Sequence, residues 1–352
     1  ARKLLIDRGA VDGSSSTSYL AAWLNRSDIV EFTGVNMSGV VNAQNAWDGC
    51  TNMVKFGVTD LSNSNNLSYA WYNTSSLTEF PSGANLGTSA SNVAFRFSWQ
   101  LSGLTAFPAL DLSKGNDFTS AWRDCSALTS FPAGAKLGTS ASNVSFTSAW
   151  QQSGLTSFST PLPTASNLSY SWFRCYDLVS FSSELPLATN VFRAWETCNS
   201  LTSFDTALPI FSNAQRAWLG CTSLTDFSAD VFSNWNPTGI ANGVFYLAWD
   251  GCTSLTATSV EAILTSIAAS GTWATTNGTS GGSALGNANI TIDYNVATGS
   301  LSAATNTAID SLSGKGWEVY INGVLVIPNI LDLEPAAAYS LRSFDANADP
   351  NV

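Results

Sequence analysis

Ten tryptophans recur along this chain at intervals of 22 to 31 residues, and this spacing constrains the fold more than any other feature. A period of this size is typical of a solenoid, in which each repeat buries its apolar face only against neighbouring repeats. Such a chain forms an elongated body with a long exposed surface. The tryptophans that we expect to form the structural core are Trp23, Trp47, Trp71, Trp99, Trp122, Trp150, Trp172, Trp195, Trp218 and Trp249.

The residues around each tryptophan follow a shared pattern, Ala-Trp-x-x-Cys-x-x-Leu-Thr-x-Phe. Ala or Ser precedes every tryptophan, and a residue this small lets adjacent coils approach closely. All six cysteines stand three residues after a tryptophan. In two repeats the leucine comes one residue early, after Gly103 and Gly154, which indicates a deletion in the turn. A phenylalanine closes nine repeats, and Thr258 takes its place in the last one.

The Leu-Thr-x-Phe segment is short, β-branched and aromatic, and it follows a polar turn, which predicts a strand. Ten such strands stacked at ~4.8 Å would form a parallel sheet of roughly 50 Å. The longer intervals coincide with two similar polar insertions, 83–92 and 134–143. We expect these insertions to bulge from one face as loops.

This unit resembles the BspA-like leucine-rich repeat, which reads roughly Ala-Phe-x-x-Cys-x-x-Leu-x-x-Ile. The resemblance covers about residues 21–258, and the same positions match ten times. Trp replaces the family's Phe, and Phe replaces its Ile. The resemblance implies a leucine-rich-repeat solenoid of short parallel β-strands in about ten coils. It also implies a binding or adhesion module of a surface protein, without catalysis.

The pattern changes at both ends of the repeats. Residues 1–20, Ser-rich after Gly9, are expected to form an N-terminal arm. Residues 259–327 are expected to form an α/β C-terminal cap: a helix through 260–267, a Gly/Thr/Ser-rich loop (270–286), a strand at 290–294, a helix at 304–312 and a hairpin at 317–327. The hairpin turns at Asn322-Gly323, and such a cap covers the apolar end of a solenoid.

Residues 328–352 are expected to form a linker or tail, possibly leading to a further domain. Within this tail, residues 336–344 read Ala-Ala-Ala-Tyr-Ser-Leu-Arg-Ser-Phe. This stretch resembles the opening of a β-rich module in phage virion proteins. The alternative is an ordinary polar C-terminal tail.

Composition excludes several classes of function. The chain has no histidine, which excludes Ser-His-Asp and Cys-His catalysis and His-ligated metals. Its net charge is −11 with no basic stripe, which argues against nucleic-acid binding. No stretch of ~20 apolar residues suggests insertion into a membrane. We expect no cofactor and no metal, and we predict that the chain is not an enzyme.

The cysteines are expected to be free thiols that pack as small hydrophobic groups in one column. Two alternatives stay open. One is disulfides between adjacent coils, among Cys175, Cys198 and Cys221. The other is a metal site.

Aromatic residues outside the repeat pattern are the candidate binding residues, because exposed rings stack on sugar faces or anchor interfaces. They are Tyr69, Tyr72, Tyr170, Phe173 and Tyr176. The alternative is that they pack under neighbouring loops or on an interdomain surface.

Carboxylates near the tryptophans are the remaining catalytic candidates, because glycoside hydrolysis needs two that converge on one bond. They are Asp48, Asp124, Glu196 and Asp250. Their repeats are mostly not adjacent, so we expect solvated charges. We expect Asn36, Asn66, Asn73, Asn143 and Asn167, each in an Asn-x-Ser/Thr triplet, to be turn residues rather than glycan acceptors.

The sequence therefore predicts a virion surface or extracellular protein, a phage tail or capsid fibre or decoration protein that attaches to a host surface glycan or protein. A bacterial or protist cell-surface adhesin and a polysaccharide depolymerase are the alternatives. Other virion proteins, and further copies of the chain in a homo-oligomer, are the additional expected partners.

Overall fold

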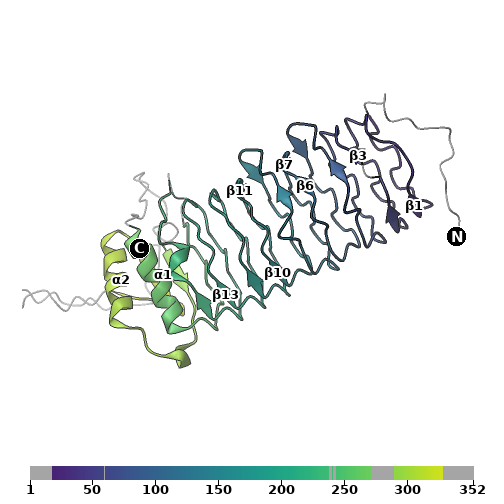
Figure 1. Cartoon of the computed structure of the whole chain (residues 1–352). Helices are drawn as coiled ribbons and strands as arrows, with labels where there is room; N and C mark the ends of the chain where they lie inside the picture. The colour runs from purple at the N-terminus through teal and green to yellow at the C-terminus, as the bar shows by residue number, and fades with distance from the viewer. Residues whose placement is uncertain (1–17, 59, 238–239, 241–242, 271–288, 328–352) are drawn as a thin grey trace, which may run out of the picture.

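The computed structural model describes residues 18–58, 60–237, 240, 243–270 and 289–327. These residues form an elongated parallel β-solenoid whose coils stack along one axis, with two helices packed at its C-terminal end (Figure 1). The predicted fold class, a repeat solenoid with an α/β C-terminal cap, is confirmed. The expected arm, the Gly/Thr/Ser-rich loop and the tail lie wholly or mostly outside the described residues.

Two columns of aromatic rings fill the interior. The ten repeat tryptophans stack with successive centroids 5.2–5.5 Å apart and ring planes 4–9° from parallel. The repeat phenylalanines form a second column, and each meets the neighbouring tryptophans mostly edge to face, as Phe56 meets Trp47 and Trp71. Parallel offset stacking within a column and edge contacts between columns are both favourable ring geometries. The column of indoles is therefore the spine of the core.

A run of tight turns carries each tryptophan, and we call the residues from three before to two after it the tryptophan segment. Its coil-to-coil register is set by backbone hydrogen bonds: the Trp amide of one coil donates to the carbonyl of the small residue in the next coil, as Trp47 does to Ala70 at 2.9 Å and Trp122 to Ala149 at 2.8 Å. This close approach explains why Ala or Ser precedes every tryptophan.

The strands that end at the repeat phenylalanines are only two residues long. They pair in parallel as β1 with β2, β10 with β12, and β13 with β14. Their bounds are β1 (Glu31–Phe32), β2 (Lys55–Phe56), β10 (Ser157–Phe158), β12 (Ser180–Phe181), β13 (Ser203–Phe204) and β14 (Asp226–Phe227).

The expected continuous ten-stranded sheet is therefore wrong for the described part of the chain. Single hydrogen bonds connect several coils instead, as the amide and hydroxyl of Thr129 both donate to the carbonyl of Thr105. The shortened turns contribute to this irregularity. A Cβ at Gly103 would lie 2.2 Å from the carbonyl oxygen of Ser75, and one at Gly154 would lie 2.3 Å from that of Ser126. Only glycine fits there.

Further short strands pair on the other sides of the coil. One set forms a four-stranded parallel sheet, in the order β11-β9-β7-β5, just before the tryptophan segments. Two more pairs, β3 with β4 and β6 with β8, form beside it. The bounds are β3 (Asp60–Leu61), β4 (Asn85–Leu86), β5 (Val93–Ala94), β6 (Asp111–Leu112), β7 (Gly115–Asp117), β8 (Lys136–Leu137), β9 (Val144–Ser145) and β11 (Ala165–Asn167).

The expectation that insertions 83–92 and 134–143 form loops is wrong for their central residues. Strands β4 and β8 lie inside these insertions, and Leu86 and Leu137 are buried. The physical reason is that the preceding coil offers a strand to pair with. The amide of Gly87 donates to the carbonyl of Leu61 at 3.0 Å, and Gly138 does the same to Leu112 at 3.1 Å.

The cap continues the solenoid with a strand and two helices. It contains η1 (Ala229–Val231) at its border, α1 (Ala257–Ala269), β15 (Asn289–Ile292), η2 (Val296–Thr298), α2 (Ala303–Gly314), β16 (Glu318–Ile321) and β17 (Val324–Leu325). The predicted helices and strands are present with shifted ends, and Asn322 and Gly323 have the positive φ of 49° and 74° that a tight hairpin turn requires. Strand β15 docks where a further coil would lie, because Trp249 donates to the carbonyl of Thr291 at 3.2 Å.

The five asparagines of the Asn-x-Ser/Thr triplets lie in turns. The side-chain oxygens of Asn36, Asn66 and Asn167 accept hydrogen bonds from the amide two residues later, which is an Asx turn. Asn73 and Asn143 have a φ of 54°. Their sequence position is therefore explained by backbone geometry.

Candidate binding surface

The tryptophan segment brings particular side chains together on the surface. Residues two before and two after each tryptophan have positive φ, so the chain makes two consecutive hydrogen-bonded turns around each indole. Tight turns place the residue two before the tryptophan beside the residue one after it, and coil stacking repeats both positions. Rings at these positions can therefore contact one another within and between coils.

The first aromatic cluster consists of Tyr69, Tyr72 and Phe97. The rings of Tyr69 and Phe97, from adjacent coils, stack with centroids 4.6 Å apart and planes 12° from parallel. Tyr72 meets Tyr69 edge to face at 5.7 Å. All three side chains are half-buried, so part of each ring faces solvent.

The second aromatic cluster consists of Tyr170, Phe173 and Phe192, four rungs further along. Tyr170 meets Phe173 at 5.6 Å and Phe192 at 5.3 Å, both edge to face. The guanidinium of Arg174 lies over the ring of Phe173 at 4.8 Å, and that of Arg193 lies over Phe192 at 5.3 Å. Cation–π contacts of this kind hold both arginines against the rings and leave their outward N–H groups on the surface.

Glu196 lies beneath the second cluster. It is 8% exposed, and its Oε2 lies 3.3 Å from Nε of Arg193. Burial raises the pKa of Glu196, while the guanidiniums of Arg193, Arg216 and Arg174 act to lower it. Three cations around one buried carboxylate leave the cluster locally positive in a chain of net charge −11.

The structure brings together four of the five predicted aromatic residues, in two pairs. Tyr176 stands apart: it is 47% exposed and makes no ring contact with a described residue. Sequence reasoning missed Phe97 and Phe192. They stand two and three residues before their tryptophans, and the matching position of Tyr69 and Phe97 in neighbouring repeats was the signal that could have identified the first of them.

The four tryptophan-adjacent carboxylates do not converge. Asp48 accepts a hydrogen bond from Nδ2 of Asn45 at 2.7 Å, and Asp124 lies 3.2 Å from Arg123. Burial raises the pKa of Asp48 and of Asp250, and nearby Asp293 raises that of Asp250 further. Each carboxylate thus has its own local surroundings, and the paired arrangement of a glycosidase is not built from this set.

The six cysteines are buried and free. Each thiol lies 2.9–3.2 Å from the carbonyl oxygen of the repeat tryptophan one coil earlier, to which it donates. Burial raises the pKa of Cys50, Cys125 and Cys175 to about 11 and that of Cys221 to about 12. A thiol held protonated is a poor nucleophile and a poor metal ligand. The disulfide alternative among Cys175, Cys198 and Cys221 is not what this structure contains.

Among the residues that the structure describes, no group of three or more His, Cys, Asp or Glu is arranged to hold a metal ion. No helix in the same residues is both long and apolar enough to span a bilayer.

Comparison with known proteins gives a fold neighbour. No protein-family model and no curated protein sequence matches the chain. A leucine-rich repeat protein from Bacteroides ovatus ATCC 8483 is similar in structure, with 13% sequence identity and a TM-score of 0.25. The match covers 67% of this chain and 80% of that one. The assignment of the fold rests on the stacked coils of this chain itself.

Proposed function

We propose that this chain is a non-catalytic surface protein that attaches to a host surface glycan or protein through its two aromatic clusters. The observation that carries the proposal is the pairing of half-buried rings on one side of the solenoid. A ring held by its neighbours loses little conformational freedom on binding, and its exposed part stacks on a sugar face or fills a protein pocket.

The spacing of the clusters supports an extended ligand or a repeated one. The two clusters lie four rungs apart, which is roughly 20 Å at a strand spacing of ~4.8 Å. Two weak contacts on one rigid body act together when the ligand can reach both, because the second contact becomes intramolecular. A surface polysaccharide or a dense array of surface proteins meets that condition.

The finer proposal is that the host-binding surface belongs to a phage virion, as part of a tail or capsid fibre or a decoration protein. It is supported by residues 336–344, whose sequence resembles a phage module junction. A cell-surface adhesin shares the same binding surface and differs in the particle that carries it.

The test measures attachment of the purified full chain to host cells and to an array of surface glycans. Tyr72→Ala and Tyr170→Ala are expected each to weaken attachment about tenfold, and the double variant more strongly, with melting temperatures close to that of the parent. Tyr176→Ala, an aromatic substitution outside both clusters, is the matched control and is expected to have little effect. Full attachment by the double variant would show that the clusters are not the binding site.

A further inference from the structure

A ladder of hydroxyl groups follows the repeat phenylalanines in three successive coils. Thr160, Ser183 and Thr206 each stand two residues after the phenylalanine of their coil. Oγ1 of Thr160 donates to the carbonyl of Pro132 at 2.9 Å, and Oγ of Ser183 donates to the carbonyl of Thr160 at 2.6 Å. Thr206 breaks the series, because its Oγ1 is buried and has no hydrogen-bond partner among the described residues.

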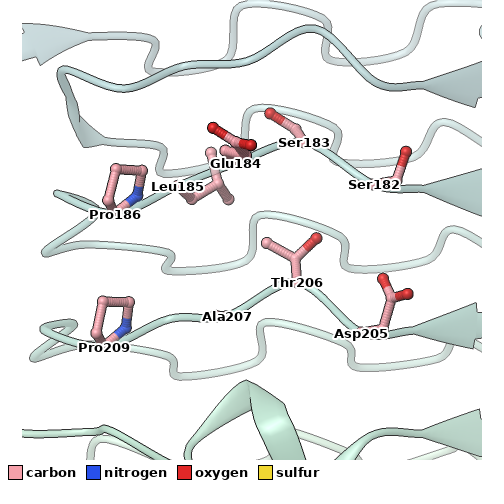
Figure 2. A pocket seen from close by; sticks show the side chains of 9 residues that line it. All are labelled: Ser182, Ser183, Glu184, Leu185, Pro186, Asp205, Thr206, Ala207 and Pro209. Carbon is pink, nitrogen blue, oxygen red and sulfur yellow. The ribbon is translucent and has the colours of Figure 1, made fainter.

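A pocket of about 440 Å³ opens at this break, between the coil of Ser183 and the coil of Thr206. Two features keep the coils apart there. No backbone hydrogen bond joins 182–186 to 205–209 in the described structure, and Pro186 and Pro209 have no N–H to donate. Figure 2 shows the side chain of Thr206 pointing toward the coil that carries Ser183 and Glu184.

The lining combines acceptors with an apolar floor. Its nine residues are Ser182, Ser183, Glu184, Leu185, Pro186, Asp205, Thr206, Ala207 and Pro209 (Figure 2). Glu184 and Asp205 supply carboxylates from adjacent coils, and ionised carboxylates only accept hydrogen bonds. The lining contains no Lys or Arg, so it disfavours an anionic ligand. A matching ligand must donate several hydrogen bonds and carry no negative charge.

We propose that this pocket binds one unit of an uncharged saccharide. Neighbouring sugar hydroxyls donate to the carboxylates of Glu184 and Asp205 in charge-assisted bonds. Thr206 Oγ1, which is 93% buried at the residue level by its 7% exposure, gains the partner that it lacks in the ladder. Leu185 and the proline rings contact the C–H face of the sugar. The volume lies within the range of about 300–1,000 Å³ that small-molecule sites occupy.

A divalent cation fits the pocket less well. Ca²⁺ takes about 6–8 oxygen ligands in proteins, whereas this lining offers two carboxylates and no third acidic side chain. The saccharide pocket is also separate from the aromatic clusters, because it lies after the phenylalanine strands β12 and β13 rather than on the tryptophan segments. It stands or falls independently of the proposed attachment through those clusters.

The experiment is saturation-transfer NMR on the full chain with glucose, galactose, mannose and N-acetylglucosamine, and with glucuronate and Ca²⁺ alone. At least one neutral sugar is expected to bind in the millimolar range. Glu184→Gln and Asp205→Asn should each weaken that sugar at least tenfold. Thr206→Val should weaken it without lowering the melting temperature, since it removes only an unpaired hydroxyl. Asp226→Asn, an exposed carboxylate one coil on and outside the pocket, is the matched control and should change nothing.

Three outcomes would overturn the pocket. The first is that none of the four neutral sugars binds. The second is that glucuronate or Ca²⁺ binds better than the neutral sugars. The third is sugar binding that survives the Glu184 and Asp205 variants and is lost in Tyr72→Ala or Tyr170→Ala. That last result would leave attachment through the aromatic clusters standing and remove the pocket.

Discussion

The single tryptophan side chain is the unit on which the core depends. Trp172 stacks between Trp150 at 5.3 Å and Trp195 at 5.4 Å, and it meets Phe181 edge to face at 4.7 Å. Trp172→Ala is expected to lower the free energy of unfolding by about 3–5 kcal/mol, because it removes these contacts and leaves a cavity. Urea unfolding followed by circular dichroism measures the loss. An unchanged midpoint would contradict the stacked core.

Trp172→Phe is the matched control at the same position. The indole N–H of Trp172 is buried without a hydrogen-bond partner, as it is in eight other repeat tryptophans. Replacing the indole by a phenyl ring creates a smaller cavity and also removes an unpaired donor, whose burial costs free energy. The expected loss is about 1–2 kcal/mol, well below that of the alanine variant.

Residue identity was readable from the sequence where a position repeats. The tryptophans and cysteines occupy one position ten and six times, and packing against an identical neighbour gives each the same surroundings. Phe192 and Thr206 were not predicted, because each owes its character to the coil beside it. Phe192 matters through its contact with Tyr170, and Thr206 through a hydrogen bond that Ser183 makes and Thr206 does not.

At the scale of the element, the turns of the tryptophan segment carry strain. Thr197 has a φ of 63°, where a β-branched residue is rare and costs about 1–2 kcal/mol. The same position holds Asn25 and Asn73 in other coils. Thr197→Asn is therefore expected to stabilise the fold by about 0.5–1 kcal/mol, measured as a rise in melting temperature, since Asn tolerates positive φ better.

Gly220→Ala is the opposite change at the equivalent position of the next coil. Gly220 has a φ of 72°, and an added Cβ would meet nothing closer than Oγ1 of Thr197 at 3.9 Å. Space is therefore available, and backbone strain alone should destabilise the variant by about 1 kcal/mol. If Thr197→Asn destabilised the protein as well, strain would not be what this position shares.

The elements were predicted correctly where side-chain pattern decides them, and less well where neighbouring coils decide them. Helix α1 and strand β16 carry their own apolar periodicity, so sequence located both. Arg193 and Ser120 at positive φ could not be foreseen from propensity. Their conformation is imposed by the ladder of backbone hydrogen bonds to the next coil, as in the 3.0 Å bond from Arg193 to the carbonyl of Gln215.

At the scale of the whole molecule, a solenoid transmits stability only between neighbouring coils. Strand β15 takes the place of a further coil after Trp249, and the helices pack behind it (Figure 1). The carboxylate of Asp293 accepts a hydrogen bond from the amide of Gly251 at 2.8 Å, which ties the cap to the last rung. Loss of this bond should therefore loosen the C-terminal end and leave the middle of the molecule unchanged.

Asp293→Ala tests this locality by native-state hydrogen exchange. Amides of the Trp249 rung are expected to exchange about tenfold faster, those of the Trp218 rung to change less, and those of the Trp122 rung to keep their protection. Asp310→Ala, an exposed acidic position on α2, is the matched control for the loss of a charge. A uniform rise along all rungs would mean that the chain opens as one cooperative unit. In that case the cap stabilises the entire binding surface, because local openings no longer separate its two aromatic clusters from the C-terminal end.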